Sequence, residues 1–207
     1  MENQLDFFNM PGSIPRAMEG LLDFKASLFD RTDSSRLFQY LKDEIQWKQE
    51  TLVLYGKRVL TPRLTAWYGD EGIAYRYSGA SFISLPWTST LLEIKAKAEA
   101  FACTRFNSVL LNLYRDGNDS MSWHSDDEKE LGTNPLIASV NFGEERRFDF
   151  KKKENPKIKH SIMLNNGSIL VMKGDIQHNW QHQIAKSMKA KGTRINLTFR
   201  LVNHNGK

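Results

Sequence analysis

The feature that most restricts the fold is a series of short apolar stretches, separated by turn residues, in the second half of the chain. From Ser108 onward the sequence predicts strands at 109–114, 138–142, 147–150, 161–164, 168–172 and 194–201. Parallel strands need connections of a dozen or more residues, usually helical, and most of the gaps here are shorter. We therefore expect an antiparallel sandwich or jelly roll rather than a parallel α/β fold.

Two helices are predicted in the first half of the chain. The first has apolar residues at every fourth position, namely Leu37, Leu41 and Ile45. Its expected N-terminal cap is Asp33 or Ser34. The second follows Pro86 and has an apolar stripe made of Leu91, Ile94, Ala98 and Phe101. We expect both helices to pack on one of the sheets, which makes the fold class α+β and mainly β.

The length of 207 residues fits one domain with short extensions. We expect an N-terminal arm over residues 1–32 and a single domain over 33–203, with a β-rich segment at 51–84 and the jelly-roll core at 108–202. The one cysteine, Cys103, cannot form an internal disulfide. The chain also shows no signal segment and no apolar run of membrane-spanning length, so we expect a cytoplasmic protein in a reducing compartment that has no contact with membranes.

Basic residues are concentrated after Glu50. Up to that residue the chain has six Lys and Arg against nine Asp and Glu, and after it 23 against 15, which gives −3 and +8 for the two parts and +5 in total. A polyanion such as nucleic acid is a plausible partner for the basic part, because each neutralised phosphate releases a counterion. An ordinary soluble basic protein is the alternative.

Two predicted strands carry polar side chains on one face only. Side chains alternate along a strand, so residues 194–201 place on one face Ile195, Leu197, Phe199 and Leu201. The opposite face carries Arg194, Asn196, Thr198 and Arg200. The strand at 109–114 likewise separates Asn112 and Tyr114 from its apolar residues. An edge strand with its polar face in water would give the same pattern.

A third polar stretch, His124-Ser125-Asp126, is interpreted as a strand with two polar side chains on one side. His-x-Asp alone is weak evidence, because such a short pattern arises easily by chance. A histidine and a carboxylate, completed by a distant histidine, are the ligand types of the facial triad that binds non-haem Fe(II). His178 and His182 are the candidates for the third ligand, and zinc remains an alternative to iron. The arginines of 194–201 suit a small dicarboxylate, because each guanidinium can bind a carboxylate through paired hydrogen bonds.

Four motifs occur in the order found in a known family: Asn112-Leu113-Tyr114, Trp123-His124-Ser125-Asp126-Asp127-Glu128, Ala138-Ser139-Val140-Asn141-Phe142-Gly143 and Arg194-Ile195-Asn196-Leu197-Thr198-Phe199-Arg200. Over residues 51–202 the chain resembles the AlkB-family dioxygenases that depend on Fe(II) and 2-oxoglutarate. The resemblance implies a double-stranded β-helix (jelly roll), an Fe(II) cofactor, and 2-oxoglutarate and O₂ as co-substrates.

The resemblance also implies roles for individual residues. The metal ligands would be His124, Asp126 and His182, which leaves His178 without a ligand role and requires no catalytic residue beyond the metal centre. The 2-oxoglutarate pocket would consist of Asn112, Tyr114, Arg194, Asn196 and Arg200.

The segment 51–84 resembles the family's nucleotide-recognition segment. Tyr75 and Tyr77 match residues that contact a flipped base, with plain sheet core as the alternative, and Asp127 and Glu128 could accept from an exocyclic amine. Tyr55 matches the plug of a hairpin inserted into duplex DNA. Contacts to nucleic acid are further expected from Gly56, Lys57, Arg58, Arg63, Lys186, Lys189 and Lys191.

The resemblance implies oxidative DNA repair as the activity. N-alkyl groups of the 1-methyladenine and 3-methylcytosine type would be removed, with release of formaldehyde, succinate and CO₂. The alternatives are an oxygenase acting on RNA or protein, and a non-catalytic nucleic-acid-binding module with a structural metal site. We expect a monomer that binds single- or double-stranded DNA, with RNA as an alternative, in the cytoplasm or in the nucleus of a eukaryotic host.

Overall fold

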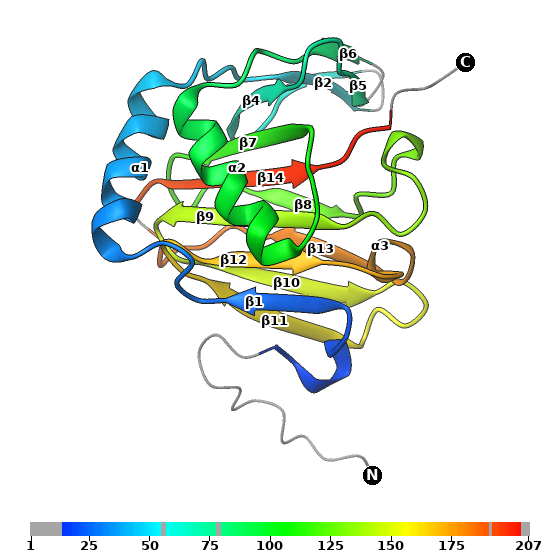
Figure 1. Ribbon diagram of the computed structural model, residues 1–207. Helices are drawn as coiled ribbons and strands as arrows, with labels where there is room; N and C mark the ends of the chain where they lie inside the picture. The colour runs from blue at the N-terminus through cyan, green and yellow to red at the C-terminus, as the bar shows by residue number, and fades with distance from the viewer. Residues whose placement is uncertain (1–13, 55–56, 78–79, 191, 204–207) are drawn as a thin grey trace.

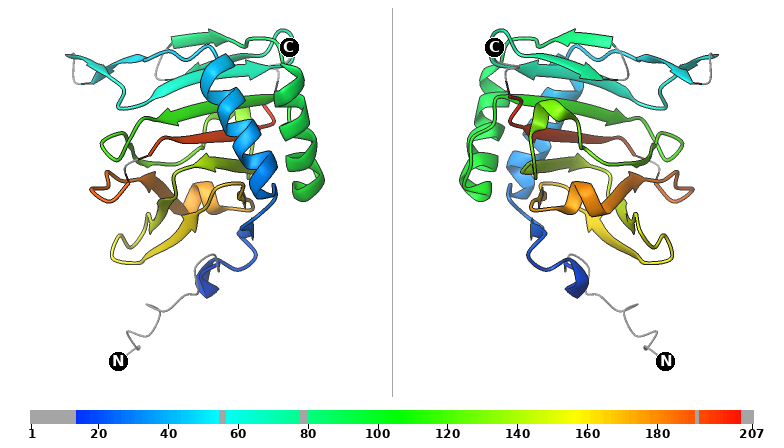
Figure 2. Two further views of the ribbon diagram at one scale, coloured as in Figure 1. Left: turned by 90° about the vertical axis from the view of Figure 1, so that its left-hand side faces the viewer. Right: turned by 90° about the vertical axis from the view of Figure 1, so that its right-hand side faces the viewer.

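The computed structural model describes residues 14–54, 57–77, 80–190 and 192–203, and for 52–54, 74–77 and 80–83 it describes the main chain alone. Two antiparallel sheets face each other, and two long helices lie on one side of them (Figures 1 and 2). The expected fold is therefore confirmed: a mainly β jelly roll with both helices on one sheet.

The larger sheet has the strand order β1-β12-β9-β14-β7-β4, and its neighbouring strands pair antiparallel. The strands are β1 (Leu22–Lys25), β12 (Ile169–Met172), β9 (Ile137–Gly143), β14 (Arg194–Arg200), β7 (Ser108–Tyr114) and β4 (Leu64–Gly69). Because β14 lies in the middle of this sheet, it is not an edge strand, and its polar face is not exposed to water.

The smaller sheet has the order β11-β10-β13-β8. Its strands are β11 (Lys159–Leu164), β10 (Arg146–Lys152), β13 (Trp180–Ile184) and β8 (Met121–His124). The predicted strand through His124-Ser125-Asp126 was wrong in extent, because β8 ends at His124 and the next two residues lie in the following loop. Two separate hairpins are formed by β2 (Thr51–Leu54) with β3 (Lys57–Leu60), and by β5 (Ala74–Tyr77) with β6 (Ala80–Ile83).

The long helices are α1 (Arg31–Glu44) and α2 (Ser89–Ala102). The cap of α1 is Asp30, whose side chain accepts from the main-chain N–H of Asp33 at 2.8 Å, so the expected cap at Asp33 or Ser34 was three or four residues too late. Three short helical segments complete the described elements: η2 (Arg16–Met18), η3 (Lys129–Leu131) and α3 (Ile176–Asn179). No described helix is long and apolar enough to cross a membrane.

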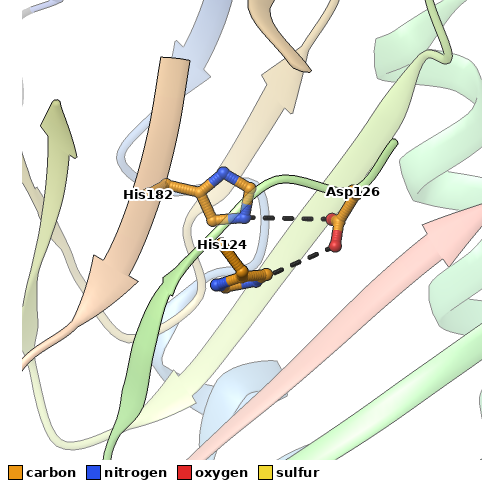
Figure 3. Close-up of side chains that lie close together, drawn as sticks. All are labelled: His124, Asp126 and His182. Carbon is orange, nitrogen blue, oxygen red and sulfur yellow. Dashed lines mark ion pairs between the residues drawn. The ribbon is translucent and has the colours of Figure 1, made fainter. Parts of the chain in front are cut away.

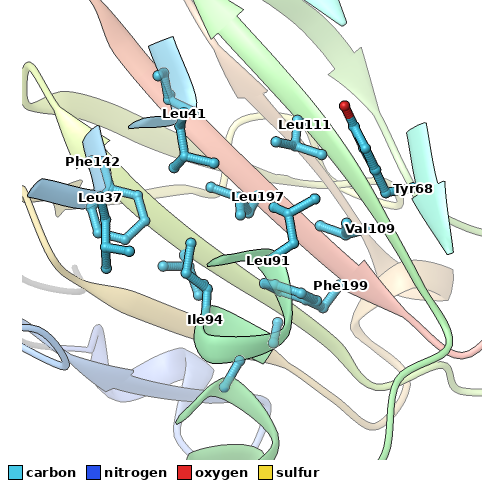
Figure 4. Packing of buried hydrophobic residues seen from close by; sticks show 14 of the residues in the cluster. Leu37, Leu41, Tyr68, Leu91, Ile94, Val109, Leu111, Phe142, Leu197 and Phe199 are labelled. Carbon is cyan, nitrogen blue, oxygen red and sulfur yellow. The ribbon is translucent and has the colours of Figure 1, made fainter. Parts of the chain in front are cut away.

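Two apolar layers cover the faces of the larger sheet. Leu37 and Leu41 of α1 and Leu91 and Ile94 of α2 pack against its outer face, where they meet Val109, Leu111, Leu197 and Phe199 (Figure 4). The second layer lies between the sheets and includes Phe150, Ile162, Leu164, Leu170 and Ile176. The apolar faces of β7 and β14 thus turn toward the helices, and their polar faces turn toward the smaller sheet.

The described part of residues 1–32 joins the larger sheet. Strand β1 pairs with β12 at the edge of the sheet, and Phe29 is buried in the layer beneath the helices. Leu201, predicted to continue the apolar face of β14, is 48% exposed because the strand ends at Arg200.

Candidate active site

Three potential metal ligands converge between the sheets. One ligand atom from each of His124, Asp126 and His182 lies within 4.8 Å of the others. Nε2 of His124 is 3.8 Å from Oδ1 of Asp126, and Nε2 of His182 is 3.9 Å from Oδ2 (Figure 3). The side chains point toward one another from the end of β8, the loop after it, and β13. Two imidazoles and one carboxylate form the ligand set of a facial triad.

Strand pairing brings the two histidines together. His124 on β8 is the direct partner of His182 on β13, and their ring centroids lie 4.2 Å apart. Nδ1 of His124 lies 2.8 Å from the main-chain O of Ser122, which favours the tautomer with the proton on Nδ1 and leaves Nε2 as a lone-pair donor.

The charge states suit a divalent cation. Burial lowers the pKa of His182 to about 3, so its imidazole is neutral near pH 7, as a metal ligand must be. Burial alone would raise the pKa of Asp126, but Arg200 and the two histidines outweigh it and hold that pKa well below its ordinary value. Nη2 of Arg200 lies 2.9 Å from Oδ1 of Asp126.

A cavity between the sheets joins this cluster to the predicted co-substrate residues. Its wall contains the three potential ligands together with Asn112, Tyr114, Arg194, Asn196 and Arg200. The structure therefore brings together all eight residues that the sequence assigned to metal and 2-oxoglutarate. Apolar side chains, among them Leu110, Met121 and Phe148, form other parts of the wall.

Arg194 provides a buried cation in the wall of the cavity. It is 2% exposed, its Nη2 donates to Oδ1 of Asn141 at 2.6 Å, and its guanidinium lies 5.0 Å from the ring centroid of Tyr114. Burial lowers the pKa of Arg194 to about 10, which leaves it charged near pH 7. Its Nε and Nη1 are buried, and Tyr114 is the described side chain with which the guanidinium interacts on this side. A buried, charged guanidinium in the wall of a cavity fits an anionic ligand such as a carboxylate.

Several buried polar residues support the pocket without having been assigned to it. Asn196 donates to Oγ of Ser139 at 2.7 Å and accepts from Oγ1 of Thr198 at 3.0 Å. Oδ1 of Asn141 accepts the hydrogen bond from Arg194. The alternation of side chains in the predicted strands could have identified Ser139, Asn141 and Thr198. No sequence pattern marks Gln177, whose Oε1 accepts from the main-chain N–H of Asp126 at 3.0 Å.

Arg63 does not have the predicted role. It is 5% exposed, its Nε donates to Oδ1 of Asn112 at 2.8 Å, and so it orients a pocket residue instead of reaching a phosphate. The sequence reasoning failed here because nearness along the chain to a hairpin does not indicate exposure.

His178 is exposed on α3 and is not part of the potential ligand cluster found among the described residues.

The predicted substrate residues are only partly described. Asp127 is exposed and lies 3.3 Å from Nζ of Lys153, whereas Oε2 of Glu128 is buried and accepts no hydrogen bond from any described residue. Lys57, Arg58, Lys186 and Lys189 are exposed. The side chains of Tyr75 and Tyr77, and residues Tyr55, Gly56 and Lys191, lie outside the described part of the chain.

A family model for the 2OG-Fe(II) oxygenase superfamily matches residues 22–200. The chain is 40% identical over 182 residues to alpha-ketoglutarate-dependent dioxygenase alkB homolog 3 of Bos taurus, with 84% of this chain and 63% of the relative covered. It is 34% identical over 194 residues to DNA oxidative demethylase ALKBH2 of Homo sapiens, with 89% and 74% covered. The chain thus spans less than two thirds of the length of the homolog 3 relative.

Solved structures show the same fold at low sequence identity. The structure of OsALKBH1 matches with a TM-score of 0.60 and 12% identity, over 93% of this chain and 99% of that one. A 2OG-Fe(II) oxygenase family oxidoreductase from Burkholderia pseudomallei matches with a TM-score of 0.60 and 14% identity, over 92% and 90%. From the superfamily match and these relatives together, it follows that the chain belongs to the AlkB family of Fe(II)- and 2-oxoglutarate-dependent dioxygenases, enzymes that consume O₂.

Proposed function

We propose that the chain is an oxidative demethylase that removes N-alkyl groups of the 1-methyladenine and 3-methylcytosine type from DNA bases, with release of formaldehyde, succinate and CO₂. Support comes from its relatives, which include proteins named DNA oxidative demethylase ALKBH2 in Homo sapiens and Arabidopsis thaliana. The excess of basic residues after Glu50 supports a nucleic-acid substrate.

One observation carries the proposal: a cavity has a His-Asp-His cluster in its wall together with a buried, charged arginine. In this proposal His124, Asp126 and His182 hold Fe(II), and Arg194 and Arg200 hold the two ends of 2-oxoglutarate, with Asn112, Tyr114 and Asn196 completing the pocket. Bound Fe(II), with 2-oxoglutarate and O₂, supplies the oxidising power needed to break a C–H bond of an N-methyl group.

The residues of the chain bind and orient the reactants. A metal ion binds imidazoles in their neutral form and a carboxylate in its ionised form, so ligation by His124, His182 and Asp126 would leave one positive charge of a divalent ion uncompensated. The anionic co-substrate can neutralise that charge while Arg194, desolvated and charged, anchors it. The apolar part of the wall limits water around the reacting methyl group.

We propose Glu128 as the acceptor for the exocyclic amine of the target base, because its buried Oε2 accepts no hydrogen bond within the described part of the chain. Asp127 is a second acceptor, although Lys153 already contacts its carboxylate. Tyr75 and Tyr77 are proposed to stack on or pack against the flipped base, on the strength of the family resemblance alone.

We propose a nucleic-acid-binding face on the side of the molecule away from the long helices. The β2–β3 hairpin and the loop between β13 and β14 both lie on that side (Figure 2). They carry the exposed residues Lys57, Arg58, Lys186 and Lys189. Tyr55 and Gly56, at the predicted turn of the hairpin, would contact the bases or backbone of the DNA.

We propose one dioxygenase domain over 33–203, with nucleotide recognition by 51–84 and the jelly-roll core at 108–202, acting as a monomer. The single cysteine, Cys103, is a free thiol, which supports a reducing compartment such as the cytoplasm or a nucleus.

The test is mass spectrometry of methylated single-stranded DNA, duplex DNA, RNA and peptides after incubation with the protein, Fe(II) and 2-oxoglutarate, with succinate measured in parallel. We expect demethylated DNA and stoichiometric succinate. Retention of the methyl group on every DNA substrate would overturn the proposal, and demethylation of RNA or peptide alone would favour those alternatives. Absence of succinate under all conditions would favour the non-catalytic binding module.

A further inference from the structure

Helix α3 lies beside the loop that carries Asp126, and Gln177 joins the two. Gln177 is fully buried, and its Oε1 accepts a hydrogen bond from the main-chain N–H of Asp126 at 3.0 Å. Its Nε2 donates to Sδ of Met172 at 3.6 Å. Both ends of the amide have partners, so the side chain is held in one orientation.

Lys153, just after β10, holds the main chain around Gln177. Its Nζ donates to the main-chain O of Gln177 at 2.8 Å and lies 3.3 Å from Oδ2 of Asp127. Its own main-chain N–H donates to the O of Asn179 at 2.8 Å. A third segment therefore connects α3 to the residue that follows Asp126.

These contacts couple two segments that carry potential ligands. Helix α3 continues into β13, which carries His182, and Oγ of Ser125 donates to the main-chain O of Trp180 at 2.9 Å. The loop with Asp126 is thus bonded to the α3–β13 segment at two points, through Gln177 and through Ser125. A metal site requires its ligands to be placed within a few tenths of an ångström, so contacts that fix their spacing affect metal affinity.

We propose that Gln177 is a positioning residue for the metal ion: it fixes the main chain at Asp126 and thereby the distance between the Asp126 carboxylate and His182. Lys153 supports this role by holding Gln177 in place. Gln177 contributes no ligand atom and acts only through Asp126. The inference rests on the proposed function, specifically on the proposed metal ligands.

The test is a titration of the full, metal-free chain with Co(II), followed by calorimetry and by the visible absorption of the bound ion. Gln177→Met keeps the length of the side chain but removes the acceptor, and we expect the Kd for Co(II) to rise roughly 10- to 100-fold, with altered absorption bands. Gln177→Glu keeps an oxygen acceptor for the main-chain N–H of Asp126, and we expect a Kd within about threefold of the wild-type value.

Asn107→Leu is the matched control, because Asn107 makes two hydrogen bonds of 2.8 Å to the main chain of Val202 and does not line the cavity. It should lower the melting temperature and leave the Kd unchanged. A wild-type Kd for Gln177→Met, or no recovery in Gln177→Glu, would overturn the positioning role.

If Gln177→Met does not fold, Lys153→Met provides the test of the positioning role. The Lys153 side chain is 33% exposed, so the fold should tolerate its replacement. We expect a Kd at least about threefold higher than wild type, and an unchanged Kd would overturn the role. Failure of the proposed metal site would look different, because the wild-type chain itself would then bind no Co(II). Failure of the demethylase activity alone would appear as Co(II) binding by the wild-type chain without demethylation of any DNA substrate.

Discussion

Asp126 carries a buried carboxylate in the candidate site. Arg200 is its cationic neighbour at 2.9 Å, with the imidazoles of His124 at 3.8 Å and His182 at 3.9 Å. A buried charge is costly unless it is compensated. The arrangement keeps Asp126 ionised, which is the form that binds a cation.

Replacing Asp126 with Ala should abolish turnover and metal binding and leave a folded chain, because the cluster loses its only anionic ligand. Succinate formation, Co(II) titration and circular dichroism measure these three properties. Asp149→Ala is the control, since Asp149 pairs with Arg147 at 2.7 Å and does not line the cavity. Iron-dependent turnover retained by Asp126→Ala would contradict the ligand assignment.

Arg194→Lys should raise the KM for 2-oxoglutarate by about 10- to 100-fold, because an ammonium cannot reproduce the paired donors of a guanidinium. Hydrogen bonds to charged groups contribute about 1.5–3 kcal/mol each, and about 1.4 kcal/mol corresponds to a factor of ten. Steady-state kinetics with varied 2-oxoglutarate measure the change. Arg105→Lys, at a side chain that is 88% exposed, should leave the KM unchanged. An unaltered KM in Arg194→Lys would argue against carboxylate binding there.

At the scale of elements, the loop between β13 and β14 is held against the loop after β7. The main-chain N–H of Ser187 donates to the O of Gly117 at 2.8 Å, and Nη2 of Arg146 donates to the O of Ala185 at 2.6 Å. A side chain at Gly117 would collide with the main-chain O of Ser187. These contacts hold in place the loop that carries the exposed residues Lys186 and Lys189.

Changing Lys186 or Lys189 to Ala should weaken DNA binding to a similar extent for all sequences, because phosphate contacts carry no sequence information. Each loss should reduce the slope of log K against log salt by about 0.7–0.9. Fluorescence anisotropy at several salt concentrations provides the measurement, with Lys42→Ala on α1 as a control on the helical side. Unchanged salt slopes would show that neither lysine contacts a phosphate.

At the scale of the whole molecule, the candidate site lies between the two sheets and draws residues from both. Strands β7 and β14 of the larger sheet supply the proposed co-substrate pocket, while β8 and β13 of the smaller sheet supply the histidines. Occupation of the site should therefore strengthen the association of the sheets and stabilise the entire fold.

Mn(II) with 2-oxoglutarate, each at about 100 times its Kd, should raise the unfolding free energy by about 2.7 kcal/mol for each ligand that binds the native state only. For a domain of this size, each such increment should raise the melting temperature by roughly 5–11 °C. Differential scanning calorimetry measures the shift, and EDTA should reverse it. Equal melting temperatures with and without the ligands would contradict binding between the sheets, and Asp126→Ala should show no metal-dependent shift.

The sequence by itself determined the β-strand alternation, the apolar stripes of the two helices and the types of residue in the candidate site. These are local properties: a period of two or four residues, or a motif such as Arg194 to Arg200, can be found without knowing what lies opposite. The positions of Leu37, Leu91 and Phe199 in the core followed directly from such periods.

Only the tertiary structure decided which polar groups are partners. Arg63 is buried against Asn112, which lies 49 residues further along the chain. Gln177 contacts Asp126 across a separation of 51 residues. Likewise, β14 could be recognised as a central strand only once β7 and β9 were seen on either side of it. A local pattern indicates the chemical type of a side chain and the face of the helix or strand on which it lies. Burial and hydrogen bonding depend on neighbours that folding brings together.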